Sequence, residues 1–324
     1  MTSKKKLKII FMGTPAFALP SFEAVANLEN VIAVVTQPDR PSGRGMTLTP
    51  SPIKNAALQK LIPIYQPERI RKDISFIKTL SGLDPDIIVV VAFGQILPES
   101  VLSIPPLGCI NLHASLLPKY RGAAPIQWAL IRGEKITGVA SMQMDVGMDT
   151  GGILLQQEVP IGDSETALEL SLRLSQIGAE VLVETIKQIK EEKLLPTPQP
   201  EKGVTLAPLL KKEDGTIRWQ DSAEEIFNRY RGVFAWPETT MFYGDGRDAD
   251  CARWKIVSLE IGARDGKWGE PGELLKVSAK GLEVAARIGY IIIMRLKLAG
   301  GKEISSAEYA ASNALPIGRI FHTI

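Results

Sequence analysis

The stretch "DIIVVVAFG", residues 86–94, determines the class of fold that this chain can adopt. Residues 87–92 are apolar at every position, which is typical of a parallel strand that helices cover on both faces. Around it, short β-rich runs alternate with helical stretches. The β-rich runs are 7–12, 31–36 and 108–113, and the helical stretches are 16–28 and 52–61. This alternation predicts an α/β fold with a doubly wound, mostly parallel sheet.

A long helix and a proline-rich segment follow this pattern. Thr166 and Glu169 stand in the spacing of a capping box, and apolar residues then recur at helical intervals to about Lys193. The next ten residues, "LLPTPQPEKG", hold three prolines and a glycine. Such a composition indicates a linker between two domains.

The last third of the chain has the pattern of a small β-barrel. One helix near 222–231 precedes several β-rich runs that are separated by short polar turns. These runs are 251–259, 272–278, 282–286 and 290–298. We therefore expect a first domain at 1–195, a linker at 196–210 and a barrel domain at 211–324.

Composition limits the class of protein. With 45% hydrophobic and 23% charged residues, the chain should be an ordinary soluble globular protein. No stretch comes near the roughly 18 consecutive apolar residues that span a bilayer, and the basic N-terminus leads into a short apolar run that indicates a strand, not a signal peptide. Cys109 and Cys251 are too far apart for a disulfide framework or a metal motif. We expect a cytoplasmic protein without a membrane segment or a metal.

The net charge of the chain is close to zero, at +2. Divided at residue 205, each half carries a formal charge of about +1. Any contact with nucleic acid must therefore come from a local basic patch, and charge balance alone argues mildly against such a partner.

Two polar side chains share one face of the run "GCINLH". Asn111 and His113 are two positions apart, so in a strand they point the same way and lie near its carboxyl end. Ligands of doubly wound sheets bind at such strand ends. An amide N–H and an imidazole N–H aimed at one point can form an oxyanion site for acyl transfer. The alternative is a buried histidine whose hydrogen bonds are satisfied, beside an asparagine that turns the chain.

A glycine-rich stretch supplies two carboxylates. In "MQMDVGMDTGG", residues 142–152, Asp145 and Asp149 stand among three glycines that allow a close backbone approach to a ligand. One of these carboxylates could orient His113 and raise its basicity. The alternative is an Asp-Gly turn between two strands.

Other residues point away from common chemistries. The first strand-to-helix turn, "MGTPAFALP", lacks the three glycines of a dinucleotide fingerprint, so a nicotinamide enzyme is not expected. Cys109 lies in an apolar strand with no base near it in sequence, and we assign it a packing role. The roles of Cys251 and His322 are not determined by the sequence.

A long polar segment, "TQPDRPSGRGMTLTPSP", follows the second strand at residues 36–52. Structureless loops of more than about 12 to 15 residues are usually functional or disordered. Arg40 and Arg44 make this loop basic, so it could grip an anionic macromolecule. The alternative is a solvated loop whose charge is incidental.

Taken together, five stretches resemble the methionyl-tRNA formyltransferases in order and spacing. They are "MGTPAFALP", "TQPDRPSGRG", "VVVAFGQILP", "GCINLHASLLPKYRGAAPIQWA" and "MQMDVGMDTG", and they cover most of residues 7–155. "LAPLLKKEDGTIRW" and "FAWPETT" resemble this family more weakly, and the last seventy residues match only in layout. The resemblance implies an enzyme that transfers the formyl group of 10-formyltetrahydrofolate to the α-amino group of methionine on initiator tRNA, for translation initiation.

The resemblance also implies roles for individual residues. The reacting centre of the folate-dependent formyltransferases matches Asn111, His113 and Asp149. Their tetrahydrofolate site matches the segment Ser115, Leu116, Leu117 and Pro118, with further walls at Phe93, Gly94, Ile96 and Asp145. The co-substrate 10-formyltetrahydrofolate would be required, and no metal.

In this family the loop after the second strand reaches the acceptor end of the tRNA, which implies tRNA contacts for Arg40 and Arg44. Many members carry a further lysine just after "GRG", where this chain has Met46 and Thr47, so the loop should hold tRNA less tightly. The C-terminal domain of the family is an OB-like barrel, in agreement with the pattern above.

If the barrel binds tRNA, its basic residues must gather on one face. Near the linker, the candidates are Lys211 and Lys212, with Arg229 and Arg231 on or beside the helix that follows. We expect a monomer.

Two other functions remain open on the sequence. A related folate-dependent enzyme that formylates a small amine, such as a sugar nucleotide or a purine precursor, would have the same three polar residues. A non-catalytic RNA-binding protein could retain the fold, although the intact Asn111, His113 and Asp149 argue against it.

Overall fold

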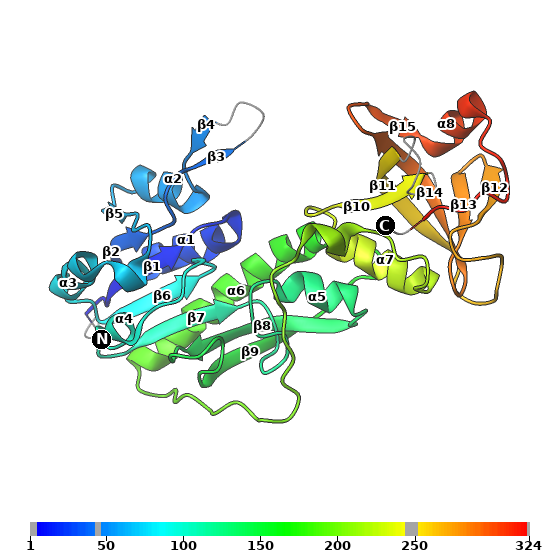
Figure 1. Ribbon diagram of the computed structural model, residues 1–324. Coiled ribbons are helices and arrows are strands. Elements are labelled where there is room, and N and C mark those ends of the chain that lie inside the picture. The colour runs from blue at the N-terminus through cyan, green and yellow to red at the C-terminus, as the bar shows by residue number, and fades with distance from the viewer. Residues whose placement is uncertain (1–4, 43–46, 244–251, 323–324) are drawn as a thin grey trace. The chain divides into compact units, whose positions relative to one another are not determined.

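The computed structural model describes residues 5–42, 47–243 and 252–322 (Figure 1). The chain divides into two compact units. Unit 1 comprises residues 1–125, 136–161 and 169–208, and unit 2 comprises residues 126–135, 162–168 and 209–324. Within the described ranges, no helix is long and apolar enough to cross a membrane.

Unit 1 is built on a seven-stranded sheet with the order β5-β2-β1-β6-β7-β8-β9. The first five of these strands are parallel, and β8 and β9 run antiparallel to their neighbours. The strands are β1 (Lys8–Gly13), β2 (Asn30–Val35), β5 (Ile64–Tyr65), β6 (Ile87–Val91), β7 (Cys109–His113), β8 (Ile136–Gln143) and β9 (Ile153–Pro160). The predicted mostly parallel α/β sheet is confirmed.

Helices cover both faces of this sheet (Figure 1). They are α1 (Leu19–Leu28), α2 (Pro52–Gln59), α3 (Ile74–Gly82), α4 (Glu99–Leu102) and α6 (Ala167–Lys190). All five residues of β6 are buried, as its apolar run predicted. On one face, Gly178 of α6 approaches so closely that a Cβ there would lie 2.7 Å from Leu112 of β7. On the other face, α3 and α4 contribute Leu80 and Val101 to the core that contains Cys109.

The segment 36–52 is not the irregular loop that the sequence predicted. It contains a short antiparallel hairpin of β3 (Arg40–Ser42) and β4 (Thr47–Thr49). The base of this segment is fixed because Asp39 accepts hydrogen bonds from Lys54 at 2.6 Å and from Gln66 at 2.8 Å. These bonds, the one from Lys54 first, hold the pKa of Asp39 below its usual value. Arg44 and Met46 lie outside the described residues.

Unit 2 contains an antiparallel sheet with the order β10-β11-β14-β13-β12, and β15 pairs with β14. Its strands are β10 (Thr239–Tyr243), β11 (Ala252–Ala263), β12 (Leu274–Ser278), β13 (Gly281–Ala285), β14 (Tyr290–Leu298) and β15 (Glu303–Ser305). Near the C-terminus, Ile320 bridges to Glu273 just before β12, and His322 bridges to Phe242 of β10. The C-terminal residues thus connect the two outer strands, which gives the sheet its barrel-like closure.

Among the described residues, three α-helices belong to unit 2 in whole or in large part. They are α5 (Pro125–Ile131), α7 (Ala223–Gly232) and α8 (Ser306–Asn313). Helix α7 starts at the capping box of Ser222 and Glu225, close to the predicted start. Helix α8 was not predicted from the sequence.

The core of unit 2 is centred on Trp254, which is 1% exposed. Its ring stacks on Tyr243 at 4.9 Å between centroids and meets the edge of Tyr309 at 4.9 Å. Phe321 lies 5.8 Å away, so the C-terminal segment packs on the same ring. One indole therefore joins β10, β11, α8 and the C-terminus.

Replacing Trp254 by alanine should lower the free energy of unfolding by about 3–5 kcal/mol, because neither the strands nor the helix can close the cavity that is left. Urea titration followed by far-UV circular dichroism measures this change. The matched control is Trp236→Ala, because Trp236 is 50% exposed. The control should stay within about 0.5 kcal/mol of the unchanged chain. Equal losses in the two variants would contradict the central role of Trp254.

Candidate active site

Asn111 and His113 lie at the carboxyl end of β7, on the face predicted from the sequence. The strand pairs with β6 on one side, where Asn111 is opposite Val90, and with β8 on the other. Asn111 is half-buried, and His113 is 6% exposed. The sheet therefore holds both side chains in fixed directions at the edge where ligands of such sheets bind.

Asp149 reaches these two side chains from the loop that joins β8 and β9. Its Oδ1 lies 3.4 Å from Asn111 Nδ2, and its Oδ2 lies 3.7 Å from His113 Nδ1. Its Oδ2 also accepts a 2.8 Å hydrogen bond from the backbone N–H of Gly122. The structure thus brings together all three residues that the sequence suggested for the reacting centre, although Asp149 lies 36 positions after His113 in the chain.

A backbone contact determines which nitrogen of His113 faces Asp149. His113 Nε2 lies 2.8 Å from the carbonyl oxygen of Tyr120. A carbonyl oxygen only accepts, so Nε2 must carry the proton in this bond. In the neutral imidazole, Nδ1 is then an unprotonated acceptor beside the Asp149 carboxylate. Nδ1 can therefore take up a proton, and the imidazolium so formed would be stabilised by the neighbouring carboxylate.

This orientation refines the oxyanion hypothesis. Asn111 Nδ2 can donate to a developing negative charge in either state of the site, whereas His113 Nδ1 can donate only after it has accepted a proton. Nδ1 and Asp149 Oδ2 lie 3.7 Å apart, which is longer than a hydrogen bond. The two atoms therefore do not occupy each other's hydrogen-bonding positions.

The segment from Ser115 to Pro118 follows β7 directly. The Ser115 hydroxyl is buried and donates to the carbonyl oxygen of Lys119 at 2.6 Å, which closes a tight turn. Leu117 is buried against Ala140 and Met142, and its carbonyl oxygen accepts a 2.9 Å hydrogen bond from Gln156. Leu116 and Pro118 are half-buried. The segment thus forms a mainly apolar turn beside His113.

A pocket of about 490 Å³ opens at the carboxyl ends of β1, β2 and β6. Its lining includes Phe93, Gly94 and Arg40 of the predicted residues. It also includes Thr14 and Gln37, whose side chains both donate to the carbonyl oxygen of Phe93, at 3.0 and 3.2 Å. These two were missed because only the strand order places the ends of β1 and β2 beside the end of β6.

Two predicted cofactor residues lie elsewhere. Ile96 is 67% exposed and does not line this pocket. Asp145 is exposed and accepts hydrogen bonds from Gly147 N–H at 3.0 Å and from the Thr150 hydroxyl at 2.7 Å. In this structure Asp145 therefore shapes its own loop, and it leaves Asp149 as the carboxylate that faces His113.

The described part of the chain contains no group of three His, Cys, Asp or Glu side chains that could hold a metal ion. Cys109, on the same face of β7 as Asn111, is buried, and burial raises the pKa of its thiol to about 12. A thiol with this pKa carries almost no thiolate near neutral pH, in keeping with the packing role expected of Cys109.

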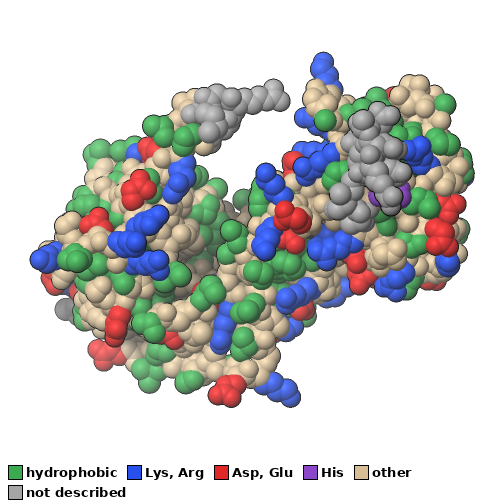
Figure 2. Space-filling model, in the orientation of Figure 1, with side chains coloured by type: hydrophobic (Ala, Val, Ile, Leu, Met, Phe, Trp, Pro, Cys, Tyr) green, Lys and Arg blue, Asp and Glu red, His purple; other side chains and the backbone are tan. Residues whose placement is uncertain are grey.

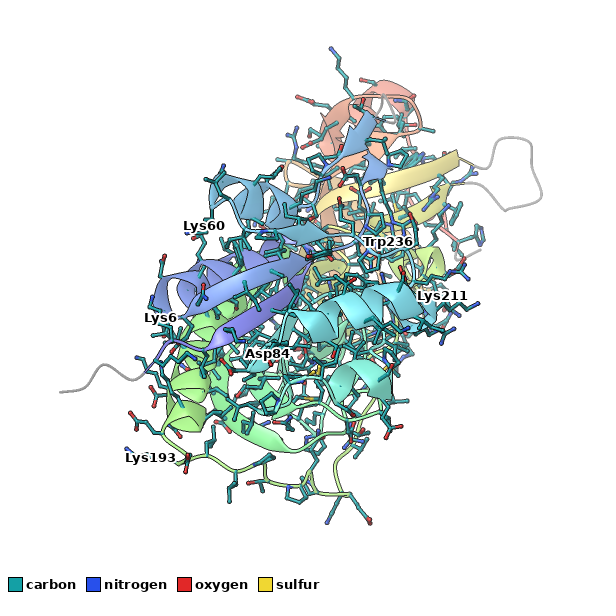
Figure 3. All side chains as sticks on the ribbon, turned by 90° about the vertical axis from the view of Figure 1, so that its left-hand side faces the viewer. Lys6, Lys60, Asp84, Lys193, Lys211 and Trp236 are labelled. Atoms are coloured by element: carbon teal, nitrogen blue, oxygen red, sulfur yellow. The ribbon has the colours of Figure 1, made fainter. Side chains whose placement is uncertain are left out.

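Among the predicted basic residues of unit 2, only the two lysines are available to a ligand. Lys211, labelled in Figure 3, and Lys212 are exposed. Arg231 is 2% exposed and donates to the carbonyl oxygens of Gly162 and Glu165. Arg229 is largely buried beside Asp221, and burial lowers its pKa. The expectation that Arg229 and Arg231 face a ligand is therefore wrong, because both guanidinium groups serve the packing of α7.

A different basic cluster lines a pocket of about 500 Å³ in unit 2. Arg253 and Lys255 of β11 alternate with the buried Trp254, and Lys297 is the partner of Lys255 on β14. Lys212 and the exposed Trp236, which Figure 3 labels, complete this side of the pocket. Figure 2 shows Lys and Arg side chains on the visible face of unit 2. In the sequence, the spacing of two between Arg253 and Lys255 could have indicated that they share one face of a strand. The place of Lys297 beside them could be known only from the pairing of β11 with β14.

Comparison with known families agrees with both units. A profile described as formyl transferase matches residues 7–186, and one described as the formyl transferase C-terminal domain matches residues 209–314. The chain belongs to the formyl transferase family. The methionyl-tRNA formyltransferase of Trichlorobacter lovleyi is 45% identical over 97% of this chain and 96% of its own length. That of Geobacter sulfurreducens is 47% identical over 96% of each chain.

Two solved structures share the fold of this chain. An N-formyltransferase from Helicobacter canadensis, in complex with folinic acid and dTDP-3-aminofucose, matches 89% of this chain and 98% of its own with a TM-score of 0.66 and 19% identity. HypX from Aquifex aeolicus, in complex with tetrahydrofolic acid, matches 97% of this chain and 48% of its own with a TM-score of 0.62 and 14% identity. At these identities the likeness concerns the fold.

Proposed function

We propose that this formyl transferase moves the formyl group of 10-formyltetrahydrofolate to the α-amino group of methionine on initiator methionyl-tRNA. The observation that carries the proposal is the meeting of Asn111, His113 and Asp149 at the end of β7. Near full-length similarity to proteins named methionyl-tRNA formyltransferase supports the choice of substrate.

The three side chains provide what formyl transfer needs. The amine nitrogen of methionine attacks the formyl carbon, so a C–N bond forms and the carbonyl oxygen gains negative charge. Asn111 Nδ2 donates to that oxygen, and loss of one such donor typically costs a factor of about 10² to 10³ in rate. His113 Nδ1 accepts the proton that the amine loses, and Asp149 stabilises the resulting imidazolium. When the bond from the formyl carbon to N10 of the folate breaks, His113 returns that proton to N10.

The folate would lie along the carboxyl edge of the parallel strands. The apolar turn of Leu116, Leu117 and Pro118 and the pocket beside Phe93 and Gly94 provide the apolar walls and few polar groups typical of such sites. Asn111 and His113 of β7 stand on the next strand of the same edge. This order of strands supports a site in which the ring system is held beside the reacting centre.

The tRNA would be held through its phosphates. We assign contacts to Arg40, which is exposed at the start of β3, and to the unit 2 cluster that includes Lys212. Lys211 lies next to this cluster in the chain. The exposed Trp236 offers a flat apolar surface on which a base could stack.

A direct rate comparison tests the proposed function. The purified chain is mixed with 10-formyltetrahydrofolate and one of three amines: initiator methionyl-tRNA, a dTDP-linked amino sugar or glycinamide ribonucleotide. We expect rapid formylation of the methionyl-tRNA and rates lower by several orders of magnitude on the small amines. Preference for a small amine would favour the alternative function, a folate-dependent enzyme that formylates a small amine. Binding of tRNA without formylation would support the non-catalytic alternative.

Removing Arg253 and Lys297 together, as Arg253→Ala/Lys297→Ala, should weaken tRNA binding and flatten its salt dependence. Each lost phosphate contact removes about 0.7 to 0.9 from the slope of log K against log salt concentration. Filter binding at several salt concentrations measures both quantities. The control is Lys276→Ala/Lys280→Ala, which removes two charges from the same unit outside the pocket. The same slope in both variants would show that the pocket does not contact tRNA.

A further inference from the structure

Residues 196–208, which make up most of the linker predicted at 196–210, are paired with the two loops that carry the active site. Thr197 and Ile153 exchange two backbone hydrogen bonds of 2.8 Å, next to the loop of Asp149. Farther along, Arg121 N–H donates to the Thr205 carbonyl oxygen at 2.9 Å, and Ala207 N–H donates to the Arg121 carbonyl oxygen at 2.7 Å. All of these residues belong to unit 1. The segment is therefore part of the wall around the site.

Gln199 is the half-buried residue within the otherwise exposed stretch 196–203 of this segment. Its Nε2 donates to the carbonyl oxygens of Asp149 at 2.8 Å and Gly151 at 2.7 Å. Its Oε1 accepts two hydrogen bonds from Arg121, from Nε at 3.1 Å and from Nη2 at 2.8 Å. An amide has two donor hydrogens and two acceptor lone pairs, so every one of them is used.

These contacts act on a strained part of the backbone. Asp149 has a φ of 53°, in the left-handed region that side chains other than glycine seldom adopt. Such a conformation persists only where its surroundings hold it in place. Gln199 binds the carbonyl oxygen of Asp149 itself and that of Gly151, two residues farther on. On the other side, the Asp149 carboxylate is held by Gly122 N–H. Backbone and side chain of Asp149 are thus held by different groups.

We propose that Gln199, oriented by Arg121, is a positioning residue for formyl transfer, and that it keeps the Asp149 carboxylate between Asn111 and His113. This inference rests on the proposed function, in which Asp149 acts at the reacting centre. It also assigns the segment that leads to unit 2 a part in the chemistry of unit 1.

The variant Gln199→Glu tests whether Gln199 positions the loop of Asp149 or only attaches the segment 196–208 to Arg121. A glutamate has the same shape and still accepts both hydrogen bonds from Arg121, but its carboxylate cannot donate to the two loop carbonyls. We expect kcat to fall by about 10- to 100-fold, since a displacement of about 1 Å at a reacting centre can cost about 10²-fold. The KM values for folate and for methionyl-tRNA should stay near those of the unchanged chain. The matched control is Gln188→Glu, the same substitution on α6, where the Gln188 amide bonds only Glu184 among the described residues.

A double-mutant cycle shows whether Gln199 acts through Asp149. If it does, Gln199→Glu should lower kcat strongly in the unchanged chain and by less than about twofold in an Asp149→Asn background. An equal fold-loss in both backgrounds, or a Gln199→Glu rate equal to that of Gln188→Glu, would overturn the inference. A raised KM with unchanged kcat would do so as well. The rate of the unchanged chain on methionyl-tRNA tests the proposed function by itself, so the two failures are distinguishable.

Discussion

Replacing His113 by alanine should lower kcat for formyl transfer by about 10² to 10⁴ and leave the affinities for folate and tRNA nearly unchanged. The reason is the position of Nδ1, which lies 3.7 Å from Asp149 Oδ2 while Nε2 is bonded to the Tyr120 carbonyl oxygen. In the proposed mechanism, the imidazole takes up the proton that the attacking amine loses, so we expect its contribution to be made in the transition state. Single-turnover kinetics with bound substrates measure the loss.

The second histidine of the chain provides the control. His322 is half-buried in unit 2, where its backbone N–H donates to the Phe242 carbonyl oxygen at 3.3 Å. His322→Ala should therefore keep the full rate of formyl transfer. Comparable activity in folded His113→Ala and His322→Ala proteins would remove His113 from the mechanism.

The second large effect is expected for Asp149→Asn. This change preserves the size of the side chain and removes its negative charge. The imidazolium of His113 then loses its stabilising neighbour, and the carboxylate acceptor of the Gly122 N–H is replaced by an amide. We expect kcat to fall by about 10² or more, with KM changing much less, in steady-state assays on methionyl-tRNA.

Asp145→Asn is the matched control for this change, because Asp145 belongs to the same glycine-rich loop. Within the part of the chain that the structure describes, its carboxylate accepts hydrogen bonds only from Gly147 and Thr150. We expect its kcat to remain near that of the unchanged chain. A rise in KM for folate would support the wall that the family resemblance implies for Asp145. Equal losses of kcat in Asp145→Asn and Asp149→Asn would assign the effect to the loop as a whole and not to the charge beside His113.

The sequence predicted those features that depend on residues close to one another in the chain. The apolar run at 87–92 predicted a buried parallel strand, and the structure has β6 at Ile87–Val91. The period of two along a strand placed Asn111 and His113 on one face before their surroundings were known. The segment 36–52 shows the limit, because its prolines and glycines favour a loop, whereas the structure pairs the short strands β3 and β4 in a hairpin.

Burial was the property that local patterns predicted least well. Lys211, Lys212, Arg229 and Arg231 are alike in sequence as basic residues near the linker. The packing of α7 buries both arginines, whereas Lys212 lines the basic pocket together with Arg253, Lys255 and Lys297. Whether a charged side chain on a helix is exposed or buried depends on which elements pack against each face of that helix. The sequence pattern of the helix does not show which elements these are.

By itself, the sequence determined the α/β class, the barrel-like second unit and the shared strand face of Asn111 and His113, because strand periodicity and residue chemistry act over a few positions. The choice of Asp149 over Asp145 came from the family resemblance. The tertiary structure decided how the side chains of this site are arranged. It set Nδ1 of His113 toward Asp149, and it brought Gln199 to the backbone of Asp149 and to Arg121 from 50 and 78 residues away. A hydrogen bond needs its two atoms within about 3.5 Å, and only the path of the folded chain determines which distant groups come that close.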